Sequence, residues 1–109
     1  MRHAFQRDAN HSRIVSIFEA HGGTWFDTAD HRKLGVDGGL FRRAGLRLPN
    51  WSEVKHFCWV EIKDGSKPPS ARKLKPSEEA FRNKCLLAGV PWVCIETDEE
   101  ALALVRVTQ

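Results

Sequence analysis

Glu61 and Lys63 are two ionisable residues that stand two positions apart in a stretch of alternating polar and apolar side chains. Because successive side chains leave a strand on opposite faces, a strand over residues 57–63 places Glu61 and Lys63 on the same face. The opposite face is apolar and is expected to contact the core through Cys58, Val60 and Ile62. The pattern predicts either a site with a carboxylate beside an ammonium group, or an exposed ion pair worth less than about 1 kcal/mol.

A second acid, Asp37, lies among the glycines at positions 35, 38 and 39, in a glycine-broken strand expected over residues 34–41. If this strand pairs with the strand that carries Glu61, the two carboxylates meet at one point. Mg²⁺ takes oxygen ligands and keeps several waters, so two carboxylates with open positions are enough to bind it. The glycines are expected to let a nucleic-acid backbone approach closely. Alternatively, Asp37 is a turn residue beside glycines.

This set of groups predicts metal-assisted hydrolysis of a phosphodiester. The cation would stabilise charge on the phosphoryl group and help to ionise the attacking water. Lys63 would orient that water or stabilise the developing charge. Mg²⁺ or Mn²⁺ is therefore the expected cofactor, and a nucleic acid is the expected substrate.

Basic residues gather around the central strand, although the net charge of the chain is only +3. Residues 32–47 include five bases and one acid, and residues 63–75 again include five bases and one acid, whereas residues 76–109 contain six acids and three bases. Such a distribution favours a polyanionic partner through counterion release, with solvated charged loops as the alternative. The side chains expected to bind nucleic acid are Arg42, Arg43, Lys67, Arg72 and Lys73.

The elements that must position these groups can be read from the remaining pattern. A first helix is expected over residues 9–21, capped by Asp8 and stopped by the glycines at 22 and 23. A short strand follows at 24–27, and residues 42–55 are expected to be irregular. The buried stripe of the first helix comprises Ile14, Val15, Ile17 and Phe18.

The second half of the chain begins with a helix at Pro76, whose inner face is expected to carry Phe81, Cys85 and Ala88. A strand over residues 91–95 follows, and Thr97 with Glu100 forms a capping box for a last helix. The order α-β-β-β-α-β-α predicts an α+β (α/β) domain with a mixed sheet of about four strands flanked by helices.

Length and composition are those of one globular domain over residues 1–109. No apolar run approaches the roughly 20 residues that span a bilayer, and no signal peptide is expected. Cys58, Cys85 and Cys94 form no CxxC pair and are expected to be reduced, buried thiols of a cytoplasmic protein.

Residues 60–76, which read VEIKDGSKPPSARKLKP, resemble the signature of small, phage-type VRR-NUC nucleases of the PD-(D/E)XK superfamily. Residues 7–10 (RDAN) resemble the first helix of that family, and residues 26–30 (FDTAD) and 35–37 (GVD) resemble its approach to a metal-binding aspartate. The resemblance covers nearly the whole chain except for an insertion at about residues 46–56.

The resemblance implies a restriction endonuclease-like core and a role for particular residues. Asp37 and Glu61, with Ile62, match the metal ligands, and Lys63 matches the catalytic lysine. Glu78 falls where the family has a supporting glutamine, and His11 falls where related nucleases carry a glutamate or glutamine. The resemblance further implies a homodimer similar to Holliday-junction resolvases, acting on branched DNA in a phage or its bacterial host.

Three departures from the family pattern leave alternatives open. Val36 stands in place of the motif proline, and glycines follow Asp37 where apolar residues are usual. The insertion contains Pro49-Asn50, a second match to the motif in which an amide replaces the acid. It also contains Trp51, which could stack on a base. The alternative function is an inactive nuclease-fold protein that binds nucleic acid or acts as an inhibitor.

Overall fold

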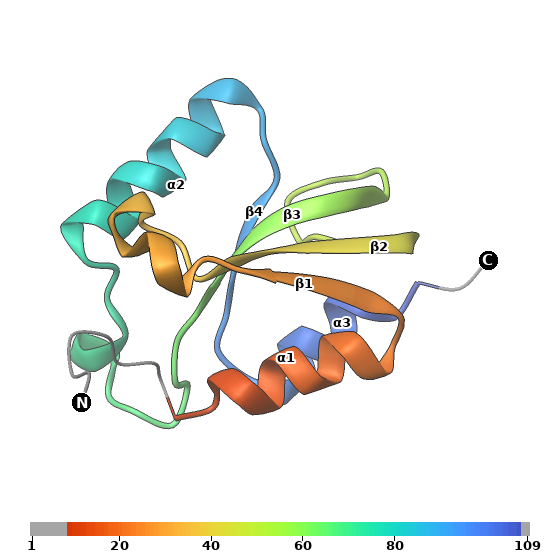
Figure 1. Ribbon diagram of the computed structural model, residues 1–109, viewed down its shortest axis with the longest axis horizontal. Helices are drawn as coiled ribbons and strands as arrows, with labels where there is room; N and C mark the ends of the chain where they lie inside the picture. The colour runs from red at the N-terminus through yellow and green to blue at the C-terminus, as the bar shows by residue number, and fades with distance from the viewer. Residues whose placement is uncertain (1–8, 108–109) are drawn as a thin grey trace.

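Four strands form one mixed sheet in the order β1-β2-β3-β4 (Figure 1). The computed structural model describes residues 9–107, apart from the side chain of Arg32. β1 pairs antiparallel with β2, β2 pairs antiparallel with β3, and β3 pairs parallel with β4. The strands are β1 (Gly23–Asp27), β2 (Gly38–Leu46), β3 (Lys55–Ile62) and β4 (Trp92–Ile95).

Helices cover both faces of this sheet. α1 (His11–Ala20) and α3 (Asp98–Val105) lie side by side on one face, and α2 (Pro76–Ala88) lies on the other with the short 3₁₀ helix η1 (Ala29–Leu34) (Figure 1). A second 3₁₀ helix, η2 (Pro69–Arg72), belongs to the connection between β3 and α2. The predicted α+β class and element order are confirmed.

The core lies between the sheet and the pair α1 and α3. As the alternation predicted, Cys58, Val60 and Ile62 point into it and are at most 1% exposed. Ile14 and Phe18 of α1 are fully buried against them. We refer to this side of the sheet as the inner face, and to the side that α2 partly covers as the outer face.

β2 differs from the prediction, because it begins at Gly38 and continues to Leu46. The expected strand over residues 34–41 and the expected irregular segment from residue 42 were therefore misplaced. The glycines are not there to admit a nucleic-acid backbone. A Cβ atom would lie 2.3 Å from the Trp25 ring at Gly38, 2.8 Å from the Phe57 ring at Gly39, and 2.3 Å from the Ser77 carbonyl oxygen at Gly35.

The remaining predictions of local structure have mixed outcomes. α1 begins after Asn10, and the predicted cap Asp8 lies outside the described residues. Ala88, expected on the inner side of α2, is exposed. Thr97 caps α3 as predicted, but the Glu100 carboxylate accepts the N–H of Glu96 rather than that of Thr97.

Residues 47–54 connect β2 to β3 at one end of the sheet, and this connection corresponds to the predicted insertion. Trp51 packs partly buried against the core, and Lys55 Nζ lies 4.4 Å from its ring. Part of the ring is therefore used within the fold, and stacking of Trp51 on a base stays a prediction. The three cysteines are free thiols, of which Cys94 is only half-buried. Within residues 9–107, no helix is long and apolar enough to cross a membrane.

Candidate active site

Asp37 and Glu61 converge where β2 begins beside β3. Gly38 pairs with Val60, so Asp37 lies beside Glu61 at the start of the strand. Asp37 Oδ2 accepts a 2.7 Å hydrogen bond from the Ile62 N–H. The Asp37 and Glu61 carboxyl groups interact directly, and each affects the pKa of the other. The structure therefore brings Asp37 to Glu61.

Asn50, the alternative match to the motif, is exposed in the connection between β2 and β3. That connection leaves β2 at Leu46, at the opposite end of the strand from Asp37. The amide is thus remote from Glu61 and is not part of this site.

Lys63 lies immediately after β3 and joins Glu61 to Glu78 of α2. Its Nζ is 3.6 Å from Glu61 Oε2 and donates a 2.9 Å hydrogen bond to Glu78 Oε1. The Lys63, Glu61 and Glu78 side chains are only 7%, 2% and 14% exposed, respectively. This burial excludes the solvated surface pair that was the alternative interpretation of the Glu61 and Lys63 pattern.

Burial and charge set the protonation of the three acids. Burial raises the pKa of Glu61 to about 10, and the Asp37 and Glu78 carboxylates add to the effect. Burial also raises the pKa of Asp37, although the Ile62 N–H opposes the shift. Burial also acts to raise the pKa of Glu78. Hydrogen bonds from the Lys63 side chain and the Lys75 N–H outweigh burial and hold this pKa below its usual value. Glu61 is therefore neutral and Glu78 ionised at neutral pH.

His11 reaches the same region from the first residue of α1. The residue is 3% exposed, and its ring meets the Trp25 ring edge-on at 6.0 Å. Its Nε2 lies 3.9 Å from Asp27 Oδ2, and the electrostatic interaction with His11 lowers the pKa of Asp37. The structure thus places the other residues expected at the site from the sequence around Asp37 and Glu61, namely Ile62, Lys63, Glu78 and His11.

Thr28 supports Asp37 and was not identified from the sequence. Its N–H donates a 3.1 Å hydrogen bond to the Asp37 carbonyl oxygen, and its hydroxyl donates to the Val36 carbonyl oxygen. Thr28 is 1% exposed, so these bonds are shielded from water. A threonine between two acids carries no signal of this role, since the bonds depend on the pairing of β1 with β2.

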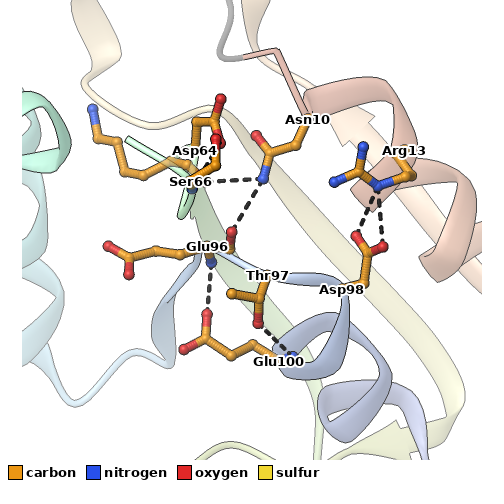
Figure 2. A network of polar contacts seen from close by, with 9 residues as sticks. Asn10, Arg13, Asp64, Ser66, Glu96, Thr97, Asp98 and Glu100 are labelled. Carbon is orange, nitrogen blue, oxygen red and sulfur yellow. Dashed lines mark hydrogen bonds and ion pairs between the residues drawn. The ribbon is translucent and has the colours of Figure 1, made fainter. Parts of the chain in front are cut away.

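Asn10 holds the main chain at Lys63 and was also missed. Figure 2 shows its side chain between the end of β3 and the segment that joins β4 to α3. The Asn10 amide nitrogen donates to the carbonyl oxygens of Lys63, at 3.0 Å, and Glu96, at 3.2 Å. An Arg13–Asp98 ion pair and an Asp64–Ser66 turn brace the same junction. The start of α1 is thereby fastened to the residue that follows the site strand.

The donor set fits a hard divalent cation that uses few protein ligands. Trp59 and Lys63 donate their N–H groups to the carbonyl oxygens of Pro91, just before β4, and of Ile95 in β4. The Ile62 N–H and carbonyl group therefore face the other way, toward Asp37. Glu61 Oε1 is buried and accepts no hydrogen bond from an N–H or hydroxyl group of the described residues. Two carboxylates and one carbonyl oxygen are the ligands that Mg²⁺ or Mn²⁺ takes.

Within residues 9–107, no three His, Cys, Asp and Glu side chains are arranged to hold a metal ion by themselves. The reason is visible in the site, because the third carboxylate, Glu78, is committed to Lys63. A cation would therefore depend on Asp37, Glu61 and the Ile62 carbonyl group, with water completing its shell.

The basic residues expected to bind nucleic acid fall into two groups. Lys67 and Lys73 are exposed on the connection from β3 to α2, between Lys63 and Glu78, while Arg72 on the same connection pairs with Glu96 at 2.9 Å. Arg43 is exposed near the far end of β2. Arg42 does not project into solvent as expected, because its guanidinium group donates to the carbonyl oxygens of His21, Gly45 and Val107.

Comparisons of the chain with protein-family models, with curated proteins and with solved structures found no match.

Proposed function

We propose that this protein is a divalent-metal-dependent nuclease that hydrolyses DNA phosphodiester bonds, with Mg²⁺ or Mn²⁺ as its cofactor. The observation that carries the proposal is the convergence of the Asp37 and Glu61 carboxyl groups with Lys63 Nζ 3.6 Å from Glu61. Membership of the VRR-NUC branch of the PD-(D/E)XK superfamily and a homodimer that acts on branched DNA belong to the same proposal.

Asp37, Glu61 and the Ile62 carbonyl group would hold the cation. When bound, the cation supplies Lewis-acid stabilisation of charge on the phosphoryl group and eases deprotonation of the attacking water. Because burial raises the pKa values of Asp37 and Glu61, a cation at the site would have to compete with protons for these carboxyl groups.

Lys63 performs the complementary role on the other side of Glu61. Its ammonium group is fixed by the 2.9 Å bond to Glu78, so it is aimed before substrate arrives. In that position it donates hydrogen bonds to the attacking water or to a phosphoryl oxygen that gains charge. Glu78 fixes the place of this amine through the same contact, which makes Glu78 a positioning residue. Lys67 and Lys73 then contact flanking phosphates.

The test is a cleavage assay on supercoiled plasmid and on a four-way junction, with Mg²⁺, Mn²⁺ or a chelator. We expect cleavage only with metal. Asp37→Asn and Lys63→Ala should each lower the rate at least about 100-fold, because each removes a group that acts on the developing charge. The matched control is Asp30→Asn, which alters an exposed acid on η1 and should cleave at the wild-type rate.

Full cleavage by Asp37→Asn or Lys63→Ala, or cleavage in chelator, would overturn the proposal. Binding of either DNA without cutting under any metal condition would instead favour an inactive nuclease-fold protein that binds nucleic acid. Circular dichroism and thermal unfolding establish that each variant is folded.

A further inference from the structure

Part of the outer face of the sheet is left open beside α2 and carries exposed phenylalanines. Phe26 of β1 is 54% exposed and Phe41 of β2 is 47% exposed. Phe26 pairs with Gly39, and Phe41 pairs with Phe57, so the three rings share one face. We call Phe26, Phe41 and Phe57 the aromatic strip.

The strip is the open end of a series of rings that α2 covers at its other end. Ring centroids lie 4.6 Å apart for Phe41 and Phe57, and 5.1 Å apart for Phe57 and Trp59. Trp59 in turn meets Phe81 of α2 edge-on at 5.3 Å. The Phe57 ring lies against Gly39, where any side chain would collide with it. The rings are thus held in place by the fold, and only their outward surfaces are available to a ligand.

The aromatic strip is aligned with the candidate active site along both central strands. Phe57, Trp59 and Glu61 alternate on the outer face of β3, which places Phe57 about 13 Å from Glu61 along the strand. Asp37 and Phe41 are related in the same way along β2. A nucleic-acid strand bound at Glu61 and Lys63 can therefore continue over the strip without leaving the sheet.

The far end of the strip is basic. Arg43 is exposed two residues beyond Phe41. An open cleft of about 570 Å³ lies at this end, and no acid is among the residues that line it, which are His21, Gly22, Arg42, Arg43, Ala44 and His56. Lys55 is already neutralised by Glu53 at 3.1 Å. Phosphates that leave the strip would thus meet the guanidinium group of Arg43.

Aromatic rings flanked by cations are the combination that binds single-stranded nucleic acid, since bases stack on the rings and phosphates contact the cations. Paired bases inside a duplex have no free faces for such stacking.

We propose that the aromatic strip stacks unpaired nucleotides of the substrate strand, so that this enzyme acts on DNA with a single-stranded segment adjacent to the cleaved bond. The inference rests on the proposed nuclease function and narrows its substrate class. It assigns Phe41 and Phe26 as binding residues and the Arg43 cleft as the exit path for the strand.

The test uses a fluorescently labelled oligothymidine of about 12 nucleotides and a duplex of equal length, titrated with protein in chelator so that no strand is cut. Phe26→Leu/Phe41→Leu keeps apolar bulk but removes two ring faces. We expect it to weaken oligothymidine binding at least about tenfold and to change duplex binding less than twofold. Phe41→Tyr retains a ring and should bind normally, and Leu87→Ala, at a residue that is 90% exposed on α2, is the matched control.

The inference would be overturned if Phe26→Leu/Phe41→Leu weakened binding of oligothymidine and duplex equally, or weakened binding of neither. It would also be overturned if Phe26→Leu/Phe41→Leu binds normally but dissociates a dimer seen by sedimentation. Activity with Mg²⁺ separates the two proposals. If oligothymidine binding depends on the rings but no DNA is cleaved, the proposed role of the aromatic strip is supported and the proposed nuclease function is overturned. If Phe26→Leu/Phe41→Leu cleaves DNA at the wild-type rate and the enzyme does not prefer a gapped duplex over a full duplex, the nuclease function is supported and the role of the aromatic strip is overturned.

Discussion

At the scale of the residue, Glu61 is a carboxyl group that the fold keeps neutral. Burial, the Asp37 carboxylate and the Glu78 carboxylate all disfavour its charged form and raise its pKa to about 10. In the unfolded chain the same group ionises near the ordinary glutamate pKa of 4.5. Below pH 4.5 the Glu61 carboxyl group is protonated in both the folded and the unfolded chain, so its ionisation does not change the free energy of unfolding. From pH 4.5 to about 10 only the unfolded chain ionises, so the free energy of unfolding falls as the pH rises.

Glu61→Gln removes this ionisation while keeping the shape of the side chain. We expect the variant to be more stable than the wild type at pH 8 in chelator by roughly 1–3 kcal/mol. The difference should shrink toward zero near pH 4.5. Urea unfolding at several pH values measures it. A difference that does not vary with pH would show that Glu61 is ionised in the folded protein. Greater stability joined to loss of metal binding is the trade-off typical of a functional residue.

The residues that bear charge were predicted from the sequence, and the residues that hold them were not. Asp37, Glu61 and Lys63 are charged groups at spacings that chemistry requires, so they could be recognised one by one. Thr28 and Asn10 act by hydrogen bonds to the main chain of other segments. Such bonds exist only after β1, β2 and α1 have been brought together.

At the scale of the element, Gly35 controls how η1 and α2 meet. Its φ of +92° is a left-handed conformation, and a Cβ atom there would lie 2.3 Å from the Ser77 carbonyl oxygen of α2. Gly89 has a similar φ of +71°, but a Cβ atom there would meet nothing within 4 Å. Substitution of Gly89 therefore measures the free-energy cost of the left-handed conformation alone, whereas substitution of Gly35 adds the cost of displacing α2.

Gly89→Ala should cost about 1 kcal/mol of stability, the usual penalty for a side chain in the left-handed region. Gly35→Ala should cost at least about 2–3 kcal/mol, because it also pushes against the backbone of α2. Since α2 carries Glu78, Gly35→Ala should in addition slow any cleavage, whereas Gly89→Ala should not. Urea unfolding measures the stabilities, and equal losses in the two variants would contradict the packing role of Gly35.

Elements with a strong periodic pattern were predicted well, and β2 was not. β3 and α3 bury apolar residues at the spacing of their own secondary structure, so local sequence identified them. α2 was identified from Pro76 at its first position. In β2, glycine is required at positions 38 and 39 because rings from β1 and β3 pack against the backbone there and leave no room for a side chain. A glycine that fits a neighbour's ring looks the same in sequence as one that breaks a strand.

At the scale of the whole molecule, positive charge is exposed on the connection from β3 to α2 and near the far end of β2. Lys67 and Lys73 lie on the connection that joins Lys63 to Glu78, which places their charge next to the candidate active site. Contacts between lysines and phosphates release counterions, and each contact adds about 0.9 to the slope of log affinity against log salt.

Lys67→Ala/Lys73→Ala should therefore lower this slope by about 2 for duplex DNA, and weaken binding at low salt. Lys84→Ala, an exposed lysine on α2, should leave the slope unchanged. Fluorescence anisotropy at several salt concentrations in chelator gives both slopes. An unchanged slope in the double variant would place the DNA on another surface.

The sequence by itself determined the class of the fold, the buried face of β3 and the identity of the ionisable groups, because each depends on residue type and on spacing along one segment. Only the tertiary structure decided that Asp37 rather than Asn50 meets Glu61, since pairing of β2 with β3 sets which residues face each other. It also decided that Arg42 binds carbonyl oxygens within the fold and that the phenylalanines of the outer face stay open. Those outcomes depend on which surfaces α1, α2 and α3 cover, and that is a property of the assembled chain.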